Sequence, residues 1–431
     1  MVLNDFLYTV IFCVVATFPL LLIAIAILVR VHNKKLYRKV YQQSKTWTIC
    51  PHCNRLVWLK TFRCSRCHEQ NELMPAMHGE DLYFSLPCRR CGTPLSSIHY
   101  SGREELTAIC PECNSPLGSQ AGVFQEVVIP IVGRRATGKS AYLAALTCTL
   151  QQHYGDRISF PFPGVAEQVE DRIRQYAAGQ NIQQTFIGPA SGFVIDMKTG
   201  TQKGTQTGDQ PPGIRLVLYD VAGEVYAEEK SMNDLKYFDF MDEMIILLDP
   251  FTVPEVRQQY AESLEQLKQR NIFDIGQGDF EEMVSRIKNG IVEKYRYADY
   301  DHANSLSSEE ERTHPYLRKD EKHYARCAVV ITKTDVFDLD RKIGEAAIRR
   351  KRRDDAGLSF EDALDQVCRE QLEDWGLGNE LLVLEDLFTE VRCFSVSAFG
   401  HLPQEGKPYE PQRVLLPLFW CLRQQFGSPV G

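Results

Sequence analysis

The hydrophobic and polar positions divide the chain into three parts. Residues 6–29 carry no charged side chain, cysteine pairs recur between 50 and 113, and from residue 125 onward short apolar runs alternate with amphipathic stretches. Strand-length apolar runs that alternate with helical patterns are typical of a parallel sheet covered by helices. The third part is therefore predicted to be an α/β domain over 123–428.

The uncharged stretch 6–29 is long enough to cross a membrane. Its 24 residues would span about 36 Å as a helix, against about 30 Å for a bilayer core. Basic residues follow the stretch rather than precede it, namely Arg30, Lys34, Lys35, Arg38 and Lys39. A cleaved signal peptide is the alternative, but it would carry its positive charge first. We therefore expect a transmembrane anchor in membrane lipid (1–30), with the N-terminus outside, a basic linker (31–45) and a cytoplasmic remainder.

The predicted strand 125–132 runs into a glycine-rich loop and then into a predicted helix over 141–152. The loop reads Gly133-Arg-Arg-Ala-Thr-Gly-Lys-Ser140, the G-x-x-x-x-G-K-S pattern of a phosphate-binding loop in its required strand–loop–helix context. Glycines let backbone N–H groups wrap the phosphates, while Lys139 would reach the β- and γ-phosphates and Ser140 would ligate Mg²⁺. The predicted nucleotide-binding residues here are Gly133, Thr137, Gly138, Lys139, Ser140 and Ala141.

Three later apolar runs each end in a short polar motif. These are 216–220, ending in Asp220-Val-Ala-Gly223; 327–331, followed by Thr332-Lys-Thr-Asp335; and 392–396, followed by Ser397-Ala398. The Asp220 carboxylate would hold a water of the Mg²⁺ shell, and the Gly223 N–H would meet the γ-phosphate. A phosphate-binding loop alone does not distinguish ATPases, kinases and GTPases, but the further motifs in this order do.

With these motifs in this order, the chain resembles the TRAFAC class of P-loop GTPases, which includes the Ras-like enzymes and translation factors. The resemblance implies an α/β P-loop NTPase fold, with a mostly parallel sheet and flanking helices, that binds GTP or GDP with Mg²⁺. It also implies that the Asp335 carboxylate accepts hydrogen bonds from the guanine N1–H and exocyclic amine, that Lys333 lies over the base, and that the Ala398 N–H contacts the guanine O6. Thr332 and Ser397 belong to the same two base-binding motifs.

The chain departs from a minimal member of that class in length and in one catalytic position. Insertions at about 251–325 and 336–390, with the anchor and cysteine pairs in front, look like the bacterial double-GTPase group. Glu224 stands where Ras-like enzymes carry the glutamine that orients the attacking water. A carboxylate cannot donate to the γ-phosphate and adds negative charge there, so hydrolysis without a partner is expected to be slow. Arg134 and Arg135 either supply positive charge in cis or face solvent or an acidic neighbour.

The switch I threonine of Ras-like enzymes, a ligand of Mg²⁺, must lie between the phosphate-binding loop and the strand 216–220. Thr185 is preferred because it follows a predicted helix that ends near Gly179 and precedes a predicted strand over 192–197. The other candidates fall in a predicted hairpin loop and are Thr199, Thr201, Thr205 and Thr207. The predicted Mg²⁺ ligands are then Ser140, Thr185 and Asp220, and the predicted catalytic residues are Lys139, Thr185 and Glu224.

Eight of the 14 cysteines form four Cys-x-x-Cys pairs. Consecutive pairs predict two zinc ribbons, one over 46–70 with Cys50, Cys53, Cys64 and Cys67, and one over 84–118 with Cys88, Cys91, Cys110 and Cys113. Four thiolates suit a closed, structural Zn²⁺ site, and the reducing cytoplasm argues against disulfides. The residue after each pair tolerates positive φ, as a tight knuckle around a metal requires: Asn54, His68, Gly92 and Asn114.

The 431 residues allow two or three domains, and the net charge of −8 does not favour binding to nucleic acid. These features predict a membrane-anchored GTPase that hydrolyses GTP to GDP and acts as a switch with a regulatory or effector protein. The alternative is a nucleotide-binding scaffold with little turnover that recruits its partner through the zinc ribbons. A third hypothesis, ribbons that read nucleic acid beside the basic run 349–353, is disfavoured because the ribbons hold few aromatic residues. Whether two copies form a homodimer stays open.

Overall fold

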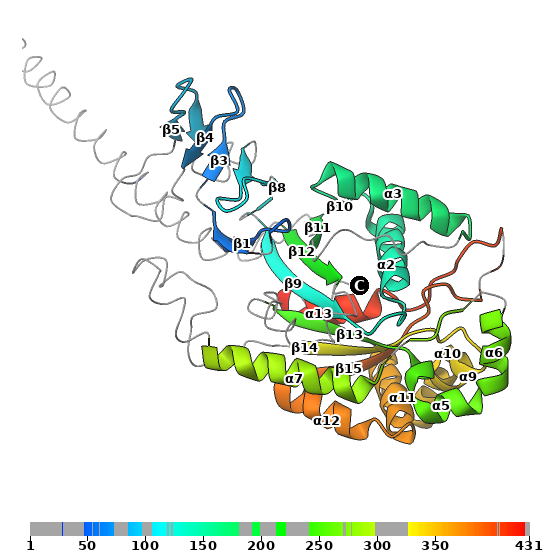
Figure 1. The fold of residues 1–431 in the computed structure, drawn as a ribbon. Coiled ribbons are helices and arrows are strands. Elements are labelled where there is room, and N and C mark those ends of the chain that lie inside the picture. Colours follow the sequence, from blue (N-terminus) through cyan, green and yellow to red (C-terminus); the bar gives the residue numbers. More distant parts are fainter. Residues whose placement is uncertain are drawn as a thin grey trace, which may run out of the picture.

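A computed structural model gives the fold of the chain (Figure 1). It describes the following residues: 28, 47–53, 55–59, 61–72, 85–96, 106–118, 120–121, 124–180, 192–198, 213–220, 241–269, 273–276, 278–297, 326–402, 404 and 406–426. Within these segments no helix has both the length and the apolar character needed to span a bilayer. The predicted anchor, apart from Leu28, and the predicted linker 31–45 lie outside the described residues.

A seven-stranded sheet forms the centre of the molecule, in the order β10-β11-β12-β9-β13-β14-β15. Its strands are β9 (Gln125–Val132), β10 (Ile158–Ser159), β11 (Gly192–Lys198), β12 (Gly213–Asp220), β13 (Glu243–Leu248), β14 (Arg326–Ile331) and β15 (Glu390–Ser395). The five strands from β12 to β15 run parallel, whereas β10 and β11 pair antiparallel at one edge. The predicted α/β domain with a mostly parallel sheet is confirmed.

Pro130 lies in the central strand β9, where its missing N–H must interrupt one of the two ladders. The interruption falls on the β13 side, because the β9–β13 register starts only at Ile131 opposite Ile245. Below that point a side chain substitutes for the ladder: Asp242 Oδ2 accepts from Val128 N–H at 2.9 Å, and Asp242 N–H donates back to the Val128 carbonyl at 3.0 Å. On the other side β9 pairs with β12 continuously.

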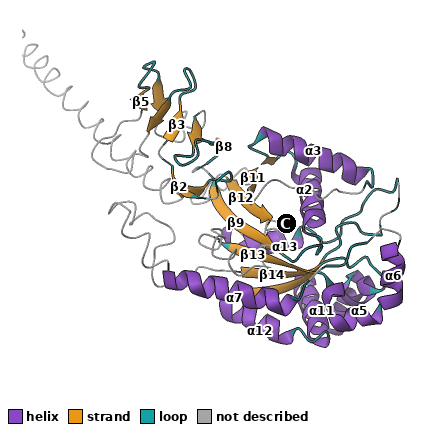
Figure 2. Cartoon of the chain, viewed as in Figure 1, coloured by secondary structure: helices purple, strands orange, loops and turns teal. Residues whose placement is uncertain are grey.

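Helices cover the sheet, and both insertions contain helices (Figure 2). α2 (Lys139–Tyr154) packs with α3 (Pro163–Ala177), and Tyr142 Oη donates to the Val414 carbonyl just before α13 (Leu416–Phe426). The first insertion contains the 3₁₀ turn η5 (Pro250–Thr252), α5 (Pro254–Gln259), α6 (Ala261–Gln269) and α7 (Phe280–Tyr297). The second contains four helices: α9 (Leu339–Ile343), α10 (Glu345–Asp354), α11 (Phe360–Asp374) and α12 (Gly378–Leu387).

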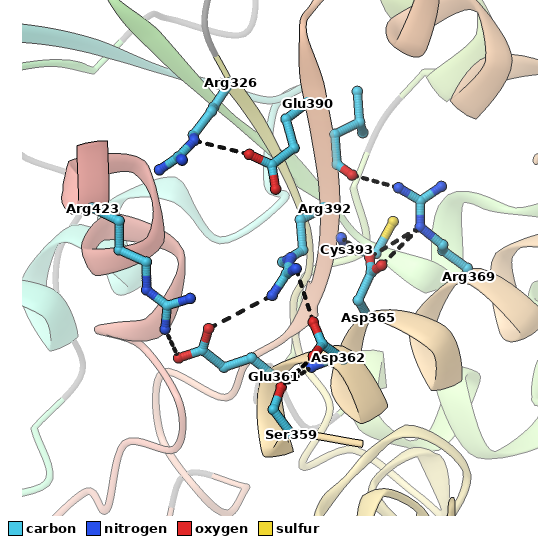
Figure 3. Close-up of polar contacts among 11 residues, drawn as sticks. Arg326, Ser359, Glu361, Asp362, Asp365, Arg369, Glu390, Arg392, Cys393 and Arg423 are labelled. Carbon is cyan, nitrogen blue, oxygen red and sulfur yellow. Dashed lines mark hydrogen bonds and ion pairs between the residues drawn. The ribbon is translucent and has the colours of Figure 1, made fainter. Parts of the chain in front are cut away.

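Ion pairs fix the second insertion and the last helix to the edge of the sheet (Figure 3). Arg392 on β15 contacts Asp362 at 2.9 Å and Glu361 at 3.6 Å, and both carboxylates lie in the first turn of α11. Glu361 also pairs with Arg423 of α13. The Trp420 ring of α13 lies 5.8 Å from the Arg392 guanidinium. The basic run 349–353 lies on α10, where Arg349 pairs with Glu345 and Lys351 pairs with Glu370 of α11.

Four short hairpins precede the sheet and make up the cysteine-rich part. Their strands are β1 (Trp47–Ile49), β2 (Leu56–Trp58), β3 (Thr61–Arg63), β4 (Gln70–Glu72), β5 (Ser85–Pro87), β6 (Pro94–Ser96), β7 (Thr107–Ile109) and β8 (Pro116–Gly118). Each hairpin carries one Cys-x-x-Cys pair between its two strands. β3 pairs antiparallel with β7, which joins the second and fourth hairpins in a four-stranded sheet. We call 47–121 the zinc unit.

Candidate functional site

The glycine-rich loop connects β9 to α2 with a tightly curled backbone. Gly138 and Ala136 have φ of 95° and 61°, in the left-handed region that glycine adopts most easily. Gly133 has no room for a side chain, since an added Cβ would lie 2.7 Å from Thr137 Oγ1 and 3.2 Å from the Leu247 carbonyl. Ser140 lies in the first turn of α2, where backbone N–H groups lack helical acceptors. The loop can therefore surround an anion with N–H donors.

The side chains of Lys139 and Thr137 donate hydrogen bonds to backbone carbonyls of the same loop. Lys139 Nζ donates to the carbonyls of Gly133 at 2.6 Å and Arg134 at 3.2 Å. Thr137 Oγ1 donates to the Arg134 carbonyl at 2.8 Å. The ammonium thus lies over the curled backbone, within reach of an anion that the N–H groups would hold. All six residues predicted to bind phosphate lie in this loop or in the helical turn after it.

The two predicted base-binding motifs lie beside the phosphate loop at the carboxyl edge of the sheet. Thr332 Oγ1, after β14, donates to the Thr137 carbonyl at 2.8 Å. Ser397 Oγ, after β15, donates to Asp335 Oδ1 at 2.5 Å and accepts from Gly400 N–H at 2.7 Å. Three segments that span about 260 residues of the sequence are thereby brought together, as ligands at the carboxyl ends of parallel strands require.

The two arginines of the loop, Arg134 and Arg135, have different surroundings. Its guanidinium forms an ion pair at 3.1 Å with Glu282, in the first turn of α7, and its side chain is 14% exposed. Arg135 is exposed. In this arrangement Arg134 faces an acidic neighbour, the second of the two expected alternatives.

The other two predicted catalytic residues, Thr185 and Glu224, lie outside the described residues, and so does the predicted phosphate-binding Gly223. For Asp220, a predicted Mg²⁺ ligand, only the backbone is described, opposite Ile131 at the end of the β12–β9 ladder. The predicted set of Mg²⁺ ligands therefore remains a prediction.

An aromatic cluster beside Asp335 escaped the sequence analysis. Tyr176 of α3 lies with its ring centroid 5.1 Å from Tyr409 and 6.3 Å from Phe399, the residue after Ala398. Burial, together with the charges of Cys148, Asp335 and Tyr409, raises the pKa of Tyr176. No motif marks these residues, because they meet only when α3 and the loop after Ser397 pack together.

The eight paired cysteines form two four-sulfur sets, but not the sets predicted. One set is Cys50, Cys53, Cys110 and Cys113, and the other is Cys64, Cys67, Cys88 and Cys91. The first pair thus joins the fourth, and the second joins the third. The prediction of two consecutive ribbons, 46–70 and 84–118, is wrong. The reason is the antiparallel β3–β7 ladder, which merges both halves into one unit and points the second and fourth hairpins in opposite directions.

Both sulfur sets have dimensions suited to zinc. A tetrahedral Zn²⁺ with bonds of about 2.3 Å places its sulfurs about 3.8 Å apart. The Sγ–Sγ distances are 3.6 Å for Cys50–Cys113 and 3.8 Å for Cys53–Cys110 in the first set. They are 3.7 Å and 3.5 Å in the second set. Each set can therefore hold a metal ion.

The backbone around the cysteines also fits a metal knuckle. His68, Gly92 and Asn114 have φ of 60°, 71° and 58°, as expected for the residue after a pair, while Asn54 is outside the described residues. Hydrogen bonding from the Cys91 backbone lowers the pKa of Cys88 to about 6, whereas burial raises the pKa of Cys110 to about 11. A bound cation would hold both as thiolates, because metal binding displaces the thiol proton.

The zinc unit is packed on the sheet at the end opposite the phosphate loop. Glu126, 5% exposed near the start of β9, accepts from Thr48 Oγ1 at 3.1 Å and Ile49 N–H at 3.3 Å. Arg215, near the start of β12, donates to the Leu117 carbonyl at 2.7 Å. The zinc unit therefore contacts β9 and β12, the strands that lead to the phosphate-binding loop and to Asp220, respectively.

Comparisons with known proteins give partial similarities. No protein-family model matches the chain. Over 172 residues it is 28% identical to the putative ESX-1 scaffolding and assembly protein SaeC of Mycolicibacterium smegmatis, a match that covers 36% of this chain and 41% of that protein. The chain thus spans less than half the length of this relative. The small GTPase Arl6 (BBS3) of Trypanosoma brucei, solved with the nucleotide analogue GppNp, aligns with 70% of this chain and 99% of its own, at 10% identity and a TM-score of 0.26.

Proposed function

We propose that the chain is a GTP-binding protein that hydrolyses GTP with Mg²⁺ and acts as a switch on the cytoplasmic face of a membrane. The observation that carries the proposal is the 2.8 Å hydrogen bond from Thr332 Oγ1 to the Thr137 carbonyl. It joins a loop built to surround phosphate to a loop that presents a carboxylate, Asp335, for a base. One nucleotide can contact both loops only because they are neighbours.

The residues at this edge divide the recognition of GTP among them. Backbone N–H groups of 133–141 and the Lys139 ammonium would hold the phosphates. Asp335 would accept from guanine N1–H and the exocyclic amine, and the 2.5 Å hydrogen bond from Ser397 holds this carboxylate in place. An adenine presents the opposite donor and acceptor pattern, so the site should reject ATP. Ser140 would help to hold Mg²⁺, and the ion would neutralise charge on the phosphates.

Slow unaided hydrolysis is part of the proposal. Glu224 replaces a water-orienting glutamine, and Arg134 is occupied by Glu282 at 3.1 Å rather than free to stabilise the phosphates. A partner protein would then supply the missing positive charge or release Arg134. In the same proposal, the zinc unit binds two structural Zn²⁺ ions and the anchor 1–30 holds the protein to lipid.

Titration calorimetry of the cytoplasmic part, 46–431, with GTP, GDP and ATP tests the assignment. GTP and GDP should bind and ATP should not. Asp335→Asn should weaken GTP and favour xanthine nucleotides, because an amide presents a donor where the carboxylate accepted. Lys139→Ala should abolish binding while zinc content stays unchanged. Equal binding of ATP and GTP, or wild-type GTP affinity in Asp335→Asn, would overturn the guanine assignment.

A second candidate is a nucleotide-binding scaffold with little turnover. Its support is the partial similarity to SaeC, described as a scaffolding and assembly protein, together with Glu224. Tight GTP binding combined with no phosphate release over many hours would favour the scaffold. Repeated turnover, even at a slow rate, would favour the switch.

A further inference from the structure

Asp249 is a fully buried carboxylate at the carboxyl end of β13, outside every motif discussed above. Its exposed fraction is 0%, so each of its oxygens needs a partner within the protein. Oδ1 accepts from the Phe251 N–H at 3.0 Å, and Oδ2 accepts from the Gly276 N–H at 2.7 Å. The remaining partner of Oδ2 is the ammonium of Lys333, at 2.7 Å.

Lys333 is held from several sides at once. Besides Asp249, its Nζ donates to the carbonyls of Ala136 at 2.8 Å and Asp274 at 2.6 Å. The Phe273 ring centroid lies 4.6 Å from the same nitrogen. An ammonium has three N–H donors, and three oxygen acceptors surround this one. The Lys333 backbone is fixed as well, in the left-handed region with φ of 56°.

Two of these contacts come from the first insertion. Phe273 and Asp274 lie in the stretch 273–276 before α7, about 60 residues before Lys333 in sequence. Gly276 allows this stretch to approach closely, since an added Cβ would lie 2.7 Å from Thr252 Cγ2 and 3.0 Å from Asp249 Oδ2. The first insertion therefore reaches the carboxyl edge of the sheet, where the predicted base-binding motifs lie, and covers the end of the Lys333 side chain.

We propose that Asp249 and the stretch 273–276 position Lys333 for the nucleotide, an inference that rests on the proposed function. Drawing the ammonium toward Asp249 keeps its charge off the phosphates and stretches the four-carbon stem beside the loop. The stem then offers a fixed apolar surface for the face of the base. Asp249 acts through Lys333 and touches no nucleotide, so it is a positioning residue. The first insertion is then part of the nucleotide site.

Release of a fluorescent GDP analogue, N-methylanthraniloyl-GDP, from the full-length protein tests this role. Asp249→Asn should raise the release rate about tenfold, because the uncharged amide no longer holds the ammonium. Lys333→Ala should give a similar increase. The double variant should release no faster than Lys333→Ala alone, since Asp249 has nothing to position once the lysine is gone. Multiplying effects in the double variant would overturn the proposal.

Asp354→Asn is the matched control. It removes the same charge by the same substitution at an exposed carboxylate, the last residue of α10, which is not among the Lys333 contacts described above. This variant should release the probe at the wild-type rate. An increase equal to that of Asp249→Asn would show a general charge effect and would overturn the positioning role.

A second variant covers the case in which Asp249→Asn does not fold. Phe273→Leu removes the ring from Lys333 but leaves the buried carboxylate in place, and it should raise the release rate about threefold. Folding of each variant is judged by its zinc content and thermal unfolding. If wild-type protein binds no guanine nucleotide, the proposed function itself fails. If it binds and Asp249→Asn and Phe273→Leu release at the wild-type rate, only the positioning role fails.

Discussion

Arg215 Nη1 donates to the carbonyl oxygen of Leu117 at 2.7 Å and so joins the central sheet to the zinc unit. The same guanidinium forms two hydrogen bonds with Asp196 on the neighbouring strand, at 2.8 and 3.1 Å. Both side chains of this ion pair are almost fully buried, at 4% and 2% exposure. Because the Arg215 side chain is buried and hydrogen-bonds to both the central sheet and the zinc unit, it fixes these two parts to each other.

Arg215→Ala should therefore destabilise the protein strongly. It leaves Asp196 as a buried carboxylate without its partner, and breaking a buried pair in this way costs about 3–5 kcal/mol. Denaturant unfolding of the zinc-loaded protein measures the loss. The matched control is Arg349→Ala, which removes an arginine that is 76% exposed and pairs with Glu345 within a helix; it should change the free energy of unfolding by less than about 0.5 kcal/mol. A small loss of unfolding free energy in Arg215→Ala would show that the contacts of Arg215 stabilise neither the sheet nor the zinc unit.

Zinc analysis of paired-cysteine variants tests the nested pairing of the cysteines. Replacing Cys50 and Cys53 by serine should reduce the zinc content from two ions per chain to one. Adding the replacement of Cys110 and Cys113 should leave it at one, because both pairs serve the same ion. Adding the replacement of Cys64 and Cys67 instead should remove the second ion too. Consecutive ribbons would give the reverse pattern for the two combined variants.

The cysteines show where reasoning from the sequence reaches its limit. The existence of four knuckles is a local property, readable from the spacing and from the residues after each pair, and three of those residues do have positive φ. Which knuckles share an ion depends on the β3–β7 ladder, between segments more than 40 residues apart. Spacing holds no information about that ladder.

The predicted nucleotide-binding residues at the carboxyl edge of the sheet show the same difference between local features, which the sequence predicts, and long-range contacts, which it does not. Strands such as β9 and β14 were predictable because their apolar runs and the polar motifs that follow them are adjacent in sequence. The partners of Lys333 were not, because Asp249 and Phe273 belong to no motif and reach the lysine only through the fold of an insertion. Thr185 and Glu224 lie outside the described residues, so their roles stay predictions.

Glu243 should make stability depend on pH. Burial at the start of β13, with Asp242 beside it, raises the pKa of Glu243 from 4.5 to about 9. The folded state then binds more protons than the unfolded state between these values, so stability falls as pH rises through this window. Glu243→Gln cannot ionise, so its free energy of unfolding should exceed that of wild type by up to about 1.4 kcal/mol for each pH unit above 4.5, which amounts to several kcal/mol at pH 8.

The pH trend distinguishes this effect from a simple change in packing. Urea unfolding of Glu243→Gln and wild type, compared at pH 5.0, 6.5 and 8.0, should show a difference that widens with pH. Taking the difference removes contributions common to both proteins, including that of the zinc ligands. A difference that stays constant over this range would mean that Glu243 ionises alike in the folded and unfolded states.

Glu224→Gln should accelerate hydrolysis. If Glu224 is a poor substitute for glutamine, its negative charge opposes the charge on the γ-phosphate oxygens. An amide restores a donor and removes that repulsion, while nucleotide affinity barely changes. Each 1.4 kcal/mol removed from the barrier is roughly tenfold in rate, so one improved contact would give about ten-fold. Phosphate release under single-turnover conditions measures the step directly.

The other outcomes of that experiment each identify a different mechanism. A sharp loss of rate would mean that the Glu224 carboxylate takes the proton of the attacking water, and that the protein is a self-sufficient GTPase. No change would mean that another residue positions the water. Arg134 offers an independent check, because Glu282 restrains it at 3.1 Å. If Arg134 contributes once released, Glu282→Gln should also raise the rate, and Arg134→Ala combined with Glu282→Gln should abolish that gain.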